Sequence, residues 1–166
     1  MKVIKYPEDI SKQEFLDNYA ERVLKCLKSG LASSYPQVNT PGGDVPWYEW
    51  LNIYLDKGVR YIILEDDGIR GYLVWFYEGD EVQIYDLAIL PEYQMDAITL
   101  RRLLAEFIND IRKYNFKSMI AYTNLKNKRM NGILRKRGFK VVKVKERGTL
   151  YRIDIDKLFQ RLRLSE

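Results

Sequence analysis

The stretch from Val82 to Phe107, VQIYDLAILPEYQMDAITLRRLLAEF, decides the fold of this chain. Its first residues, through Leu90, are mostly apolar and predict a strand. That strand ends at Pro91, because proline lacks the backbone donor that a sheet ladder needs. After a short polar loop, apolar residues recur at helical spacing, which predicts an amphipathic helix. A strand, a tight loop and a helix N-terminus form a corner that favours an anion, because first-turn amides have no partner within the helix.

Upstream of this corner, hydrophobic periodicity predicts a strand, two helices and two more strands. These cover residues 2–6, a helix from Ser11 to Gly30, a helix from Pro46, and strands over 59–65 and 71–77. Short turns at 66–68 and 78–80 join the last two strands to the strand over 82–90. Three consecutive strands joined by short turns indicate an antiparallel meander.

Downstream, the pattern predicts a strand, a helix, a hairpin and a tail helix. These cover a strand over 116–123, a helix over 124–137 closed by Gly138, strands over 140–145 and 150–155, and a helix from Asp156. In the strand over 140–145 valine alternates with lysine, which predicts a half-exposed strand. The expected fold class is α/β with a mixed sheet, in a single domain over 1–166. Within it, 1–58 hold the first strand and two helices, 59–155 the central sheet, and 156–166 a short extra helix or tail.

Composition excludes several kinds of chemistry. The single cysteine, Cys26, excludes an internal disulfide and a multi-cysteine zinc site. The chain has no histidine, which excludes Ser-His-Asp and Cys-His catalysis. A general base must therefore be a carboxylate, a tyrosine, a lysine, the N-terminal amine or water. We expect no metal, and we expect no membrane span because no run approaches the roughly 20 apolar residues that one needs. The N-terminus has no apolar signal region, so we expect a cytoplasmic protein.

Charge is distributed unevenly along the chain. Residues 1–100 carry 9 Lys and Arg against 17 Asp and Glu, whereas residues 101–166 carry 19 against 6. The second part therefore has a net charge of +13, which suggests a polyanionic partner such as a nucleotide-like cofactor or nucleic acid. The alternative is that these cations form ordinary solvated faces.

Two motifs resemble the GNAT acetyltransferase superfamily. The strand, Leu-Ala-Ile, Leu-Pro-Glu-Tyr-Gln and the following helix are similar to its motif A, which continues as Gln/Arg-x-x-Gly-x-Gly/Ala. Gln94 matches, while Ala97 and Thr99 stand where glycines are expected. NKRMNGILRKRGFKVV is similar to the family's Asn-x-x-Ala-x-x-Phe-Tyr-Glu-Lys-x-Gly-Phe, with Leu134 in place of the tyrosine that often protonates the CoA thiolate. The order of the predicted elements also matches GNAT topology.

The resemblance implies acyl transfer from acetyl-CoA to an amine and assigns candidate residues. Asp86 interrupts an apolar strand and is the candidate base; alternatively it faces solvent or bonds a neighbouring backbone group. Tyr85 lies near the position of a catalytic glutamate in some relatives; alternatively, its side chain packs against its neighbours. The first helix and the loop and helix after it border the acceptor site, which makes Trp47 and Tyr48 candidates for acceptor binding. The implied cofactor-binding residues are Leu87, Ala88, Ile89, Leu90, Gln94, Met95, Asp96, Ala97, Ile98, Thr99, Leu100, Asn127 and Arg129.

The sequence leaves two functions open. The first is an acetyl-CoA-dependent N-acyltransferase, acting as a monomer or homodimer on an amine acceptor. The second is a catalytically inactive binding module of the same fold that uses its basic second half on nucleic acid or a protein. The missing loop glycines and the negative charge of Asp96 beside the expected phosphate motivate the second.

Overall fold

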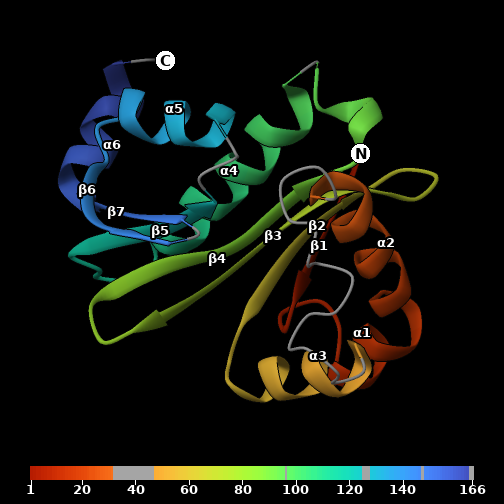
Figure 1. The fold of residues 1–166 in the computed structure, drawn as a ribbon. Helices are drawn as coiled ribbons and strands as arrows, with labels where there is room; N and C mark the ends of the chain where they lie inside the picture. Colours follow the sequence, from red (N-terminus) through yellow and green to blue (C-terminus); the bar gives the residue numbers. More distant parts are fainter. Residues whose placement is uncertain (32–46, 96, 125–127, 147, 165–166) are drawn as a thin grey trace. The chain divides into compact units, whose positions relative to one another are not determined.

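The computed structural model describes residues 1–31, 47–95, 97–124, 128–146 and 148–164 (Figure 1). Its contacts divide the chain into two compact units: unit 1, with Met1–Trp75 and Asp86–Asp110, and unit 2, with Phe76–Tyr85 and Ile111–Glu166. The elements are β1 (Lys2–Tyr6), α1 (Lys12–Asn18), α2 (Ala20–Leu31), α3 (Trp47–Asp56), β2 (Arg60–Glu65), β3 (Ile69–Glu78), β4 (Glu81–Ile89), the 3₁₀ turn η2 (Pro91–Tyr93), α4 (Ile98–Ile111), β5 (Ser118–Asn124), α5 (Lys128–Lys136), β6 (Lys140–Lys145), β7 (Gly148–Asp154) and α6 (Ile155–Leu164).

The strands form a mixed seven-stranded sheet in the order β1-β2-β3-β4-β5-β7-β6. β1 pairs antiparallel with β2, and β2 with β3. β4 pairs parallel with β5, with Glu81–Ile84 opposite Ser118–Ala121, and β7 pairs antiparallel with both β5 and β6. The parallel pair encloses α4, as a strand-helix-strand crossover requires. The predicted α/β class with a mixed sheet is confirmed.

In unit 1, one face of the strands carries aromatic residues that α1 and α2 cover. The register pairs Tyr6 with Tyr61, so the two rings share a face. Phe15 of α1 is fully buried, with its ring centroid 5.4 Å from that of Tyr6 and 4.7 Å from that of Tyr61. The ring of Tyr72 lies 5.8 Å from Tyr61 on the same face, and Cys26 of α2 is buried. This face forms an aromatic core.

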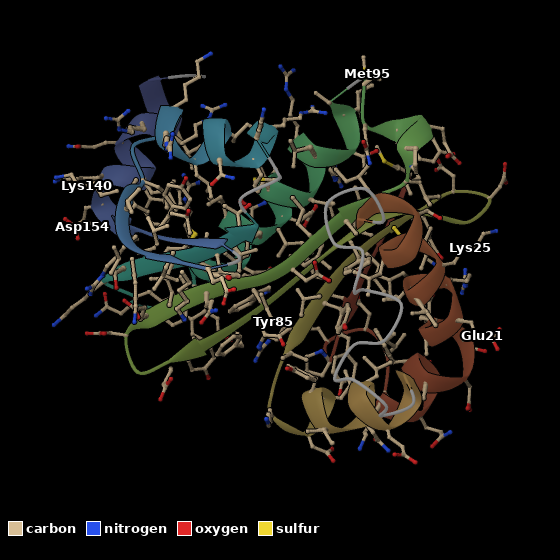
Figure 2. All side chains as sticks on the ribbon, in the orientation of Figure 1. Glu21, Lys25, Tyr85, Met95, Lys140 and Asp154 are labelled. Carbon is tan, nitrogen blue, oxygen red and sulfur yellow. The ribbon has the colours of Figure 1, made fainter. Side chains whose placement is uncertain are left out.

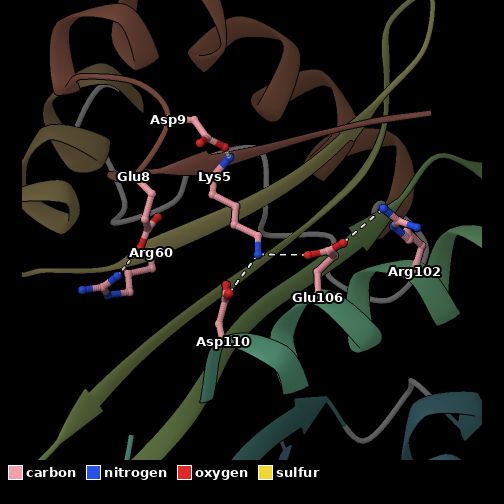
Figure 3. A network of polar contacts seen from close by, with 7 residues as sticks. All are labelled: Lys5, Glu8, Asp9, Arg60, Arg102, Glu106 and Asp110. Atoms are coloured by element: carbon pink, nitrogen blue, oxygen red, sulfur yellow. Dashed lines mark hydrogen bonds and ion pairs between the residues drawn. The ribbon is translucent and has the colours of Figure 1, made fainter. Parts of the chain in front are cut away.

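The opposite face of unit 1 packs against α4. The rings of Trp75 and Phe107 meet edge-on at 5.8 Å. Lys5 precedes Tyr6 in β1, so its side chain points to this opposite face. Its Nζ lies 2.8 Å from Asp110 Oδ1 and 2.9 Å from Glu106 Oε2 (Figure 3). An apolar contact and a half-buried ion-pair network therefore hold α4 on the strands.

Unit 2 has its own buried side chains. Tyr151 of β7 is fully buried, and its hydroxyl donates to Asn131 Oδ1 of α5 at 2.7 Å. At its surface, Tyr114, which is 38% exposed, stacks on Phe116 with 5.1 Å between ring centroids. The predicted cap at Gly138 is confirmed, because this residue ends α5 with a φ of 93°, a conformation that glycine adopts without strain.

The predicted first helix is broken at Tyr19 into two helices, α1 and α2. Tyr19 has φ −121° and ψ −27° and ends α1, and α2 begins at the next residue. The guanidinium of Arg22 donates to the carbonyl of Asn18 at 2.9 and 2.7 Å, so a side chain satisfies a carbonyl at the break. The apolar periodicity continues across the break, which is why the pattern alone indicates one helix.

The predicted half-exposed strand over 140–145 is instead exposed along its whole length. β6 is the last strand of the sheet and pairs only with β7, with a register shift between Val141 and Lys143. A position at the edge of the sheet explains why the valine residues stay accessible. The division of the contacts into two units does not test whether residues 1–166 form one domain, so the single domain stays a prediction.

Candidate active site

The predicted corner between β4 and α4 forms within unit 1 and is closed by specific hydrogen bonds. The N–H of Leu90 donates to the carbonyl of Arg70 in β3 at 2.9 Å, so β4 stays paired up to Pro91. Gln94 folds back, and its Nε2 donates to the carbonyl of Ile89 at 2.8 Å. The chain therefore reverses direction directly after β4 and enters α4 from a fixed position.

Ala97 gives this corner its conformation. It has a φ of 60°, the left-handed region that side chains disfavour and glycine adopts readily. Its carbonyl accepts the N–H of Arg101 at 3.0 Å, which makes Ala97 the residue that opens α4. In the motif that the sequence resembles, a glycine stands at this position. The alanine thus keeps the backbone conformation for which that glycine is suited.

β3 lies close to β4 and to α4 at Gly71, beside this corner. A Cβ added at Gly71 would lie 2.9 Å from the carbonyl oxygen of Ala88 and 3.1 Å from Cγ2 of Thr99. Thr99 is fully buried, and its Oγ1 has no hydrogen-bond partner among the residues that the structure describes. Thr99 therefore packs through its methyl group beside Gly71.

Asp86 is the strongest candidate for proton transfer. Its carboxylate is half-buried and accepts two hydrogen bonds, from the Tyr72 hydroxyl to Oδ2 at 2.7 Å and from the N–H of Leu87 to Oδ1 at 2.8 Å. Desolvation by burial raises the pKa of Asp86 to about 6, although both hydrogen bonds oppose that shift. A carboxylate with this pKa is ionised at neutral pH and is a stronger base than an exposed aspartate.

The groups around Asp86 stay protonated at neutral pH. Burial, and next the negative charge of Asp86, raise the pKa of the Tyr72 hydroxyl well above 10. The same two causes raise the pKa of the Cys26 thiol to about 12, and its Sγ lies 3.7 Å from the carbonyl oxygen of Ala88. Asp86 is thus the group of this cluster that can accept a proton near neutral pH.

The structure brings only some of the predicted site residues together. Asp86, Leu87–Leu90, Gln94, Ile98, Thr99 and Leu100 all lie in unit 1, whereas Tyr85 and Arg129 belong to unit 2. Ala88 and Thr99 are buried, and Met95 is 90% exposed and projects outward (Figure 2). Asp96 and Asn127 lie outside the described residues, as do the side chains of Trp47 and Tyr48 at the start of α3.

Tyr85 packs against an aromatic neighbour within unit 2. Its ring meets Phe76 edge-on at 5.9 Å.

Sequence reasoning missed Tyr72 and Gly71. Tyr72 stands in an apolar run of β3, where a tyrosine reads as core, and its hydrogen bond to Asp86 depends on the pairing of two strands. Gly71 carried a usable signal, because a lone glycine inside a strand often marks a close backbone approach. Among the described residues, no group of three or more His, Cys, Asp or Glu side chains could hold a metal ion. Over the same residues, no helix is both long and apolar enough to cross a membrane.

The fold is similar to several solved acetyltransferase structures. These include a GNAT-family acetyltransferase from Staphylococcus aureus Mu50 (15% identity, covering 93% of this chain and 98% of that chain, TM-score 0.65) and the PaiA N-acetyltransferase from Thermoplasma acidophilum in complex with coenzyme A (15%, 93% and 99%, 0.65). The ribosomal-protein-S18-alanine N-acetyltransferase from Escherichia coli is also similar (10%, 93% of each chain, 0.65). No protein-family model and no curated protein sequence matches the chain. The chain has the fold of the GNAT acetyltransferases.

Proposed function

We propose that this protein transfers an acetyl group from acetyl-CoA to an amine. The observation that carries the proposal is the left-handed backbone of Ala97 at the start of α4. An alanine adopts this conformation at a cost of about 1 kcal/mol. Retention of the conformation without the glycine supports a function for the loop, since strained backbone concentrates at functional sites.

The pyrophosphate of acetyl-CoA would lie against the N-terminus of α4. This helix has 14 residues, and its dipole and first-turn amides favour an anion at that end. The proposed contacts come from the backbone between Gln94 and Leu100, so the side chains at the glycine positions need not touch the phosphates. The buried methyl group of Thr99, turned toward Gly71, is consistent with that arrangement.

The thioester carbonyl would be polarised by a backbone amide near the end of β4. The N–H of Leu90 is engaged with β3, so the N–H of the preceding Ile89 points to the opposite edge of the strand, since successive amides alternate. A backbone donor fixed in a strand stabilises a developing oxyanion without reorganisation. Ile89 is therefore the proposed donor, and Leu87 and Ala88 shape the strand around it.

Asp86 would accept the proton of the attacking amine. The amine nitrogen attacks the carbonyl carbon, the carbon–sulfur bond breaks, and the CoA thiolate leaves. The thiolate takes a proton from water, and the hydroxide so formed takes the proton that Asp86 holds. Asp86 shares a face of the unit 1 strands with Tyr72, the face that α1 and α2 cover. In the family that the sequence resembles, the first helices border the acceptor site, so this side suits a base that meets the amine.

The acceptor is proposed to be cationic. Unit 1 carries 11 Lys and Arg against 16 Asp and Glu, a net charge of −5, which attracts protonated amines over long range. Trp47 and Tyr48 remain proposed acceptor-side residues on α3. Transfer of labelled acetyl groups from acetyl-CoA to a panel of diamines, lysine and peptides with free N-termini, read by mass spectrometry, tests the proposal. Labelled amine that depends on enzyme supports it, and acetyl-CoA left intact with every acceptor argues against it.

The second function, a catalytically inactive binding module, makes the opposite prediction in the same experiment. The negative charge of Asp96 beside the proposed phosphates and the leucine at position 134 would favour it. Leu134 is buried in α5, and its hydrocarbon side chain has no proton to give to a thiolate. A protein that leaves acetyl-CoA intact with every acceptor and binds a nucleic acid or a protein through its basic second half would establish this alternative.

A further inference from the structure

The uneven charge of the sequence separates along the two structural units. Unit 2 carries 17 Lys and Arg against 7 Asp and Glu, a net charge of +10, whereas unit 1 is net negative. An excess of this size destabilises a compact unit by self-repulsion unless an anionic partner offsets it. The distribution of these cations over unit 2 therefore indicates where a partner would bind.

Helix α5 gathers cations on one exposed face. Its exposed residues are Lys128, Arg129, Gly132, Arg135 and Lys136, which we call the α5 basic face. At 3.6 residues per turn these five positions fall within about 120° of one another. The buried residues of α5, Asn131 and Leu134, point to the other side. Apart from Gly132, every exposed residue of this amphipathic helix is therefore a cation.

The cationic surface continues beyond the helix. Arg137 and Lys140 follow α5 directly and are exposed, and Lys140 projects outward from the start of β6 (Figure 2). The Arg161 guanidinium of α6 lies against Gly138 and donates from Nη1 to the carbonyl of Lys136 at 3.5 Å. Cations near a helix C-terminus are stabilised by the helix dipole, but this effect does not account for cations along the whole of α5 and beyond it.

Five of these cations have no counter-charge among the described residues. Lys128, Arg135, Lys136, Arg137 and Lys140 form no ion pair with any carboxylate that the structure describes. The acidic residues of unit 2 that form ion pairs do so with other cations: Asp80 with Lys117, Glu81 with Arg152, and Asp154 with Lys157. The surface therefore presents uncompensated charge to solvent.

We propose that the α5 basic face, with Arg137 and Lys140, binds the phosphodiester backbone of a nucleic acid duplex. The exposed residues of α5 include no apolar or aromatic side chain, and the exposed apolar side chains that follow Lys140, Val141 and Val142, are aliphatic, whereas protein interfaces have an apolar core rich in aromatic residues. The face also lacks the rings that stack on single-stranded bases. From Lys128 to Lys136 the helix rises about 12 Å, which spans roughly three phosphates of one strand. A single CoA phosphate would leave most of these cations without a partner.

Binding through phosphates predicts a particular salt dependence. Fluorescence anisotropy with a short labelled duplex of arbitrary sequence, prepared as DNA and as RNA, measures affinity against salt. The triple variant Arg135→Gln, Lys136→Gln, Lys140→Gln should reduce the slope of log K against log salt by about 3, with about tenfold or greater weakening at low salt. A matched triple variant of unit 1, Lys2→Gln, Lys25→Gln, Lys57→Gln, removes the same charge from exposed positions and should leave the slope unchanged.

Gly132 offers a sharper test at the centre of the face. A Cβ added there meets no atom within 4 Å, and glycine is the poorest helix former after proline, so Gly132→Glu and Gly132→Gln should both stabilise α5. Only Gly132→Glu places a negative charge among the cations. We expect it to weaken duplex binding while Gly132→Gln does not, which unfolding cannot explain.

Three results would overturn the proposal: no duplex binding at low salt, equal effects of the unit 1 and unit 2 triple variants, or equal effects of the two Gly132 variants. Tighter binding of polyglutamate than of either duplex would identify an acidic protein as the partner and would also overturn it. Acetyl-CoA titration of the Gly132→Glu variant separates this proposal from the proposed acetyl transfer, because duplex binding can be lost while cofactor binding persists.

Discussion

The hydroxyl of Tyr72 donates to Oδ2 of Asp86 at 2.7 Å, joining two neighbouring strands of the sheet through their side chains. The N–H of Leu87 holds the other carboxylate oxygen. A side-chain hydroxyl and a backbone N–H fix the carboxylate in one orientation, while burial keeps its proton affinity high. This combination of fixed geometry and raised pKa is what a general base requires.

The first prediction concerns the pH dependence of transfer. Because the pKa of Asp86 is raised to about 6, the carboxylate is protonated below that pH and ionised above it. We expect kcat/KM to rise with pH through about 6, and Asp86→Asn to lower kcat by about 10²- to 10⁴-fold and to remove this limb. A pH–rate profile of both proteins checks it. An unchanged limb in the variant would assign the titration to another group.

The second prediction concerns Tyr72→Phe. The hydrogen bond from Tyr72 stabilises the ionised form of Asp86 and so lowers its pKa. Without that bond, which is worth about 1.5–3 kcal/mol to a charged acceptor, the acidic limb should move about one pH unit or more above 6. Tyr77→Phe, at an exposed tyrosine of unit 2, is the control and should leave the limb in place. A shift toward lower pH in Tyr72→Phe contradicts the assignment.

The third prediction concerns the corner at Ala97. Glycine adopts its φ of 60° without strain, so Ala97→Gly should raise the free energy of unfolding by about 1 kcal/mol and preserve acetyl-CoA binding. The β-branched side chain in Ala97→Val should lower both stability and affinity. Urea unfolding and cofactor titration measure the series. A glycine variant less stable than the wild type would show that the corner has a different conformation.

The fourth prediction concerns Gly71. The added Cβ of Gly71→Ala would meet the carbonyl oxygen of Ala88 at 2.9 Å, so either β4 or α4 must move. We expect a loss of about 1–3 kcal/mol in stability and weaker acetyl-CoA binding. Gly68→Ala, in the preceding turn, meets no atom within 4 Å and serves as the control. Equal effects of the two substitutions would show that the close approach at Gly71 does not require a glycine.

The fifth prediction concerns the ion-pair network that holds α4 (Figure 3). Desolvation opposes the charge of Lys5, but its bonds to Asp110 and Glu106 prevail and raise its pKa above 10.5. Lys5→Met leaves two half-buried carboxylates without this partner. We expect it to lower the free energy of unfolding by about 1–3 kcal/mol, which is less than for a fully buried pair because solvent screens these charges. Lys12→Met breaks an exposed pair with Asp56 and should cost at most about 1 kcal/mol.

The pH dependence of the same network has a definite sign. A lysine whose pKa is raised on folding stabilises the native state below its unfolded pKa, and this contribution is lost as the pH rises through the folded value. The difference in unfolding free energy between wild type and Lys5→Met should therefore be constant near neutral pH and decrease above 10.5. A difference that grows at high pH would contradict the network.

Much of this fold could be predicted from local patterns. The strand that ends at Pro91 and the helix after it follow from periodicity and from the missing donor of proline, and both are confirmed. The break at Tyr19 could not be predicted, since it involves the Arg22 guanidinium and an aromatic contact between α1 and the strands. The exposure of β6 depends on its place in the sheet order, which the alternation of valine and lysine does not encode.

Only those features of the candidate site that lie within one stretch of sequence could be predicted. Asp86 was conspicuous because a charge interrupts an apolar strand, and burial does raise its pKa. Its partner Tyr72 could not be recognised, because the hydrogen bond joins residues on different strands. The conformation of Ala97 was also hidden, since alanine adopts a left-handed φ too rarely for its sequence position to predict it.

The most direct test of the central claim is isothermal titration of acetyl-CoA into the wild type and the Ala97→Val variant. If the backbone around Ala97 holds the diphosphate, the wild type should bind one acetyl-CoA per chain with a dissociation constant below about 1 mM, within the range that enzymes show for their substrates. The variant should bind at least about tenfold more weakly. Absence of heat with the wild type at millimolar cofactor, or equal affinities for the two proteins, would contradict the account.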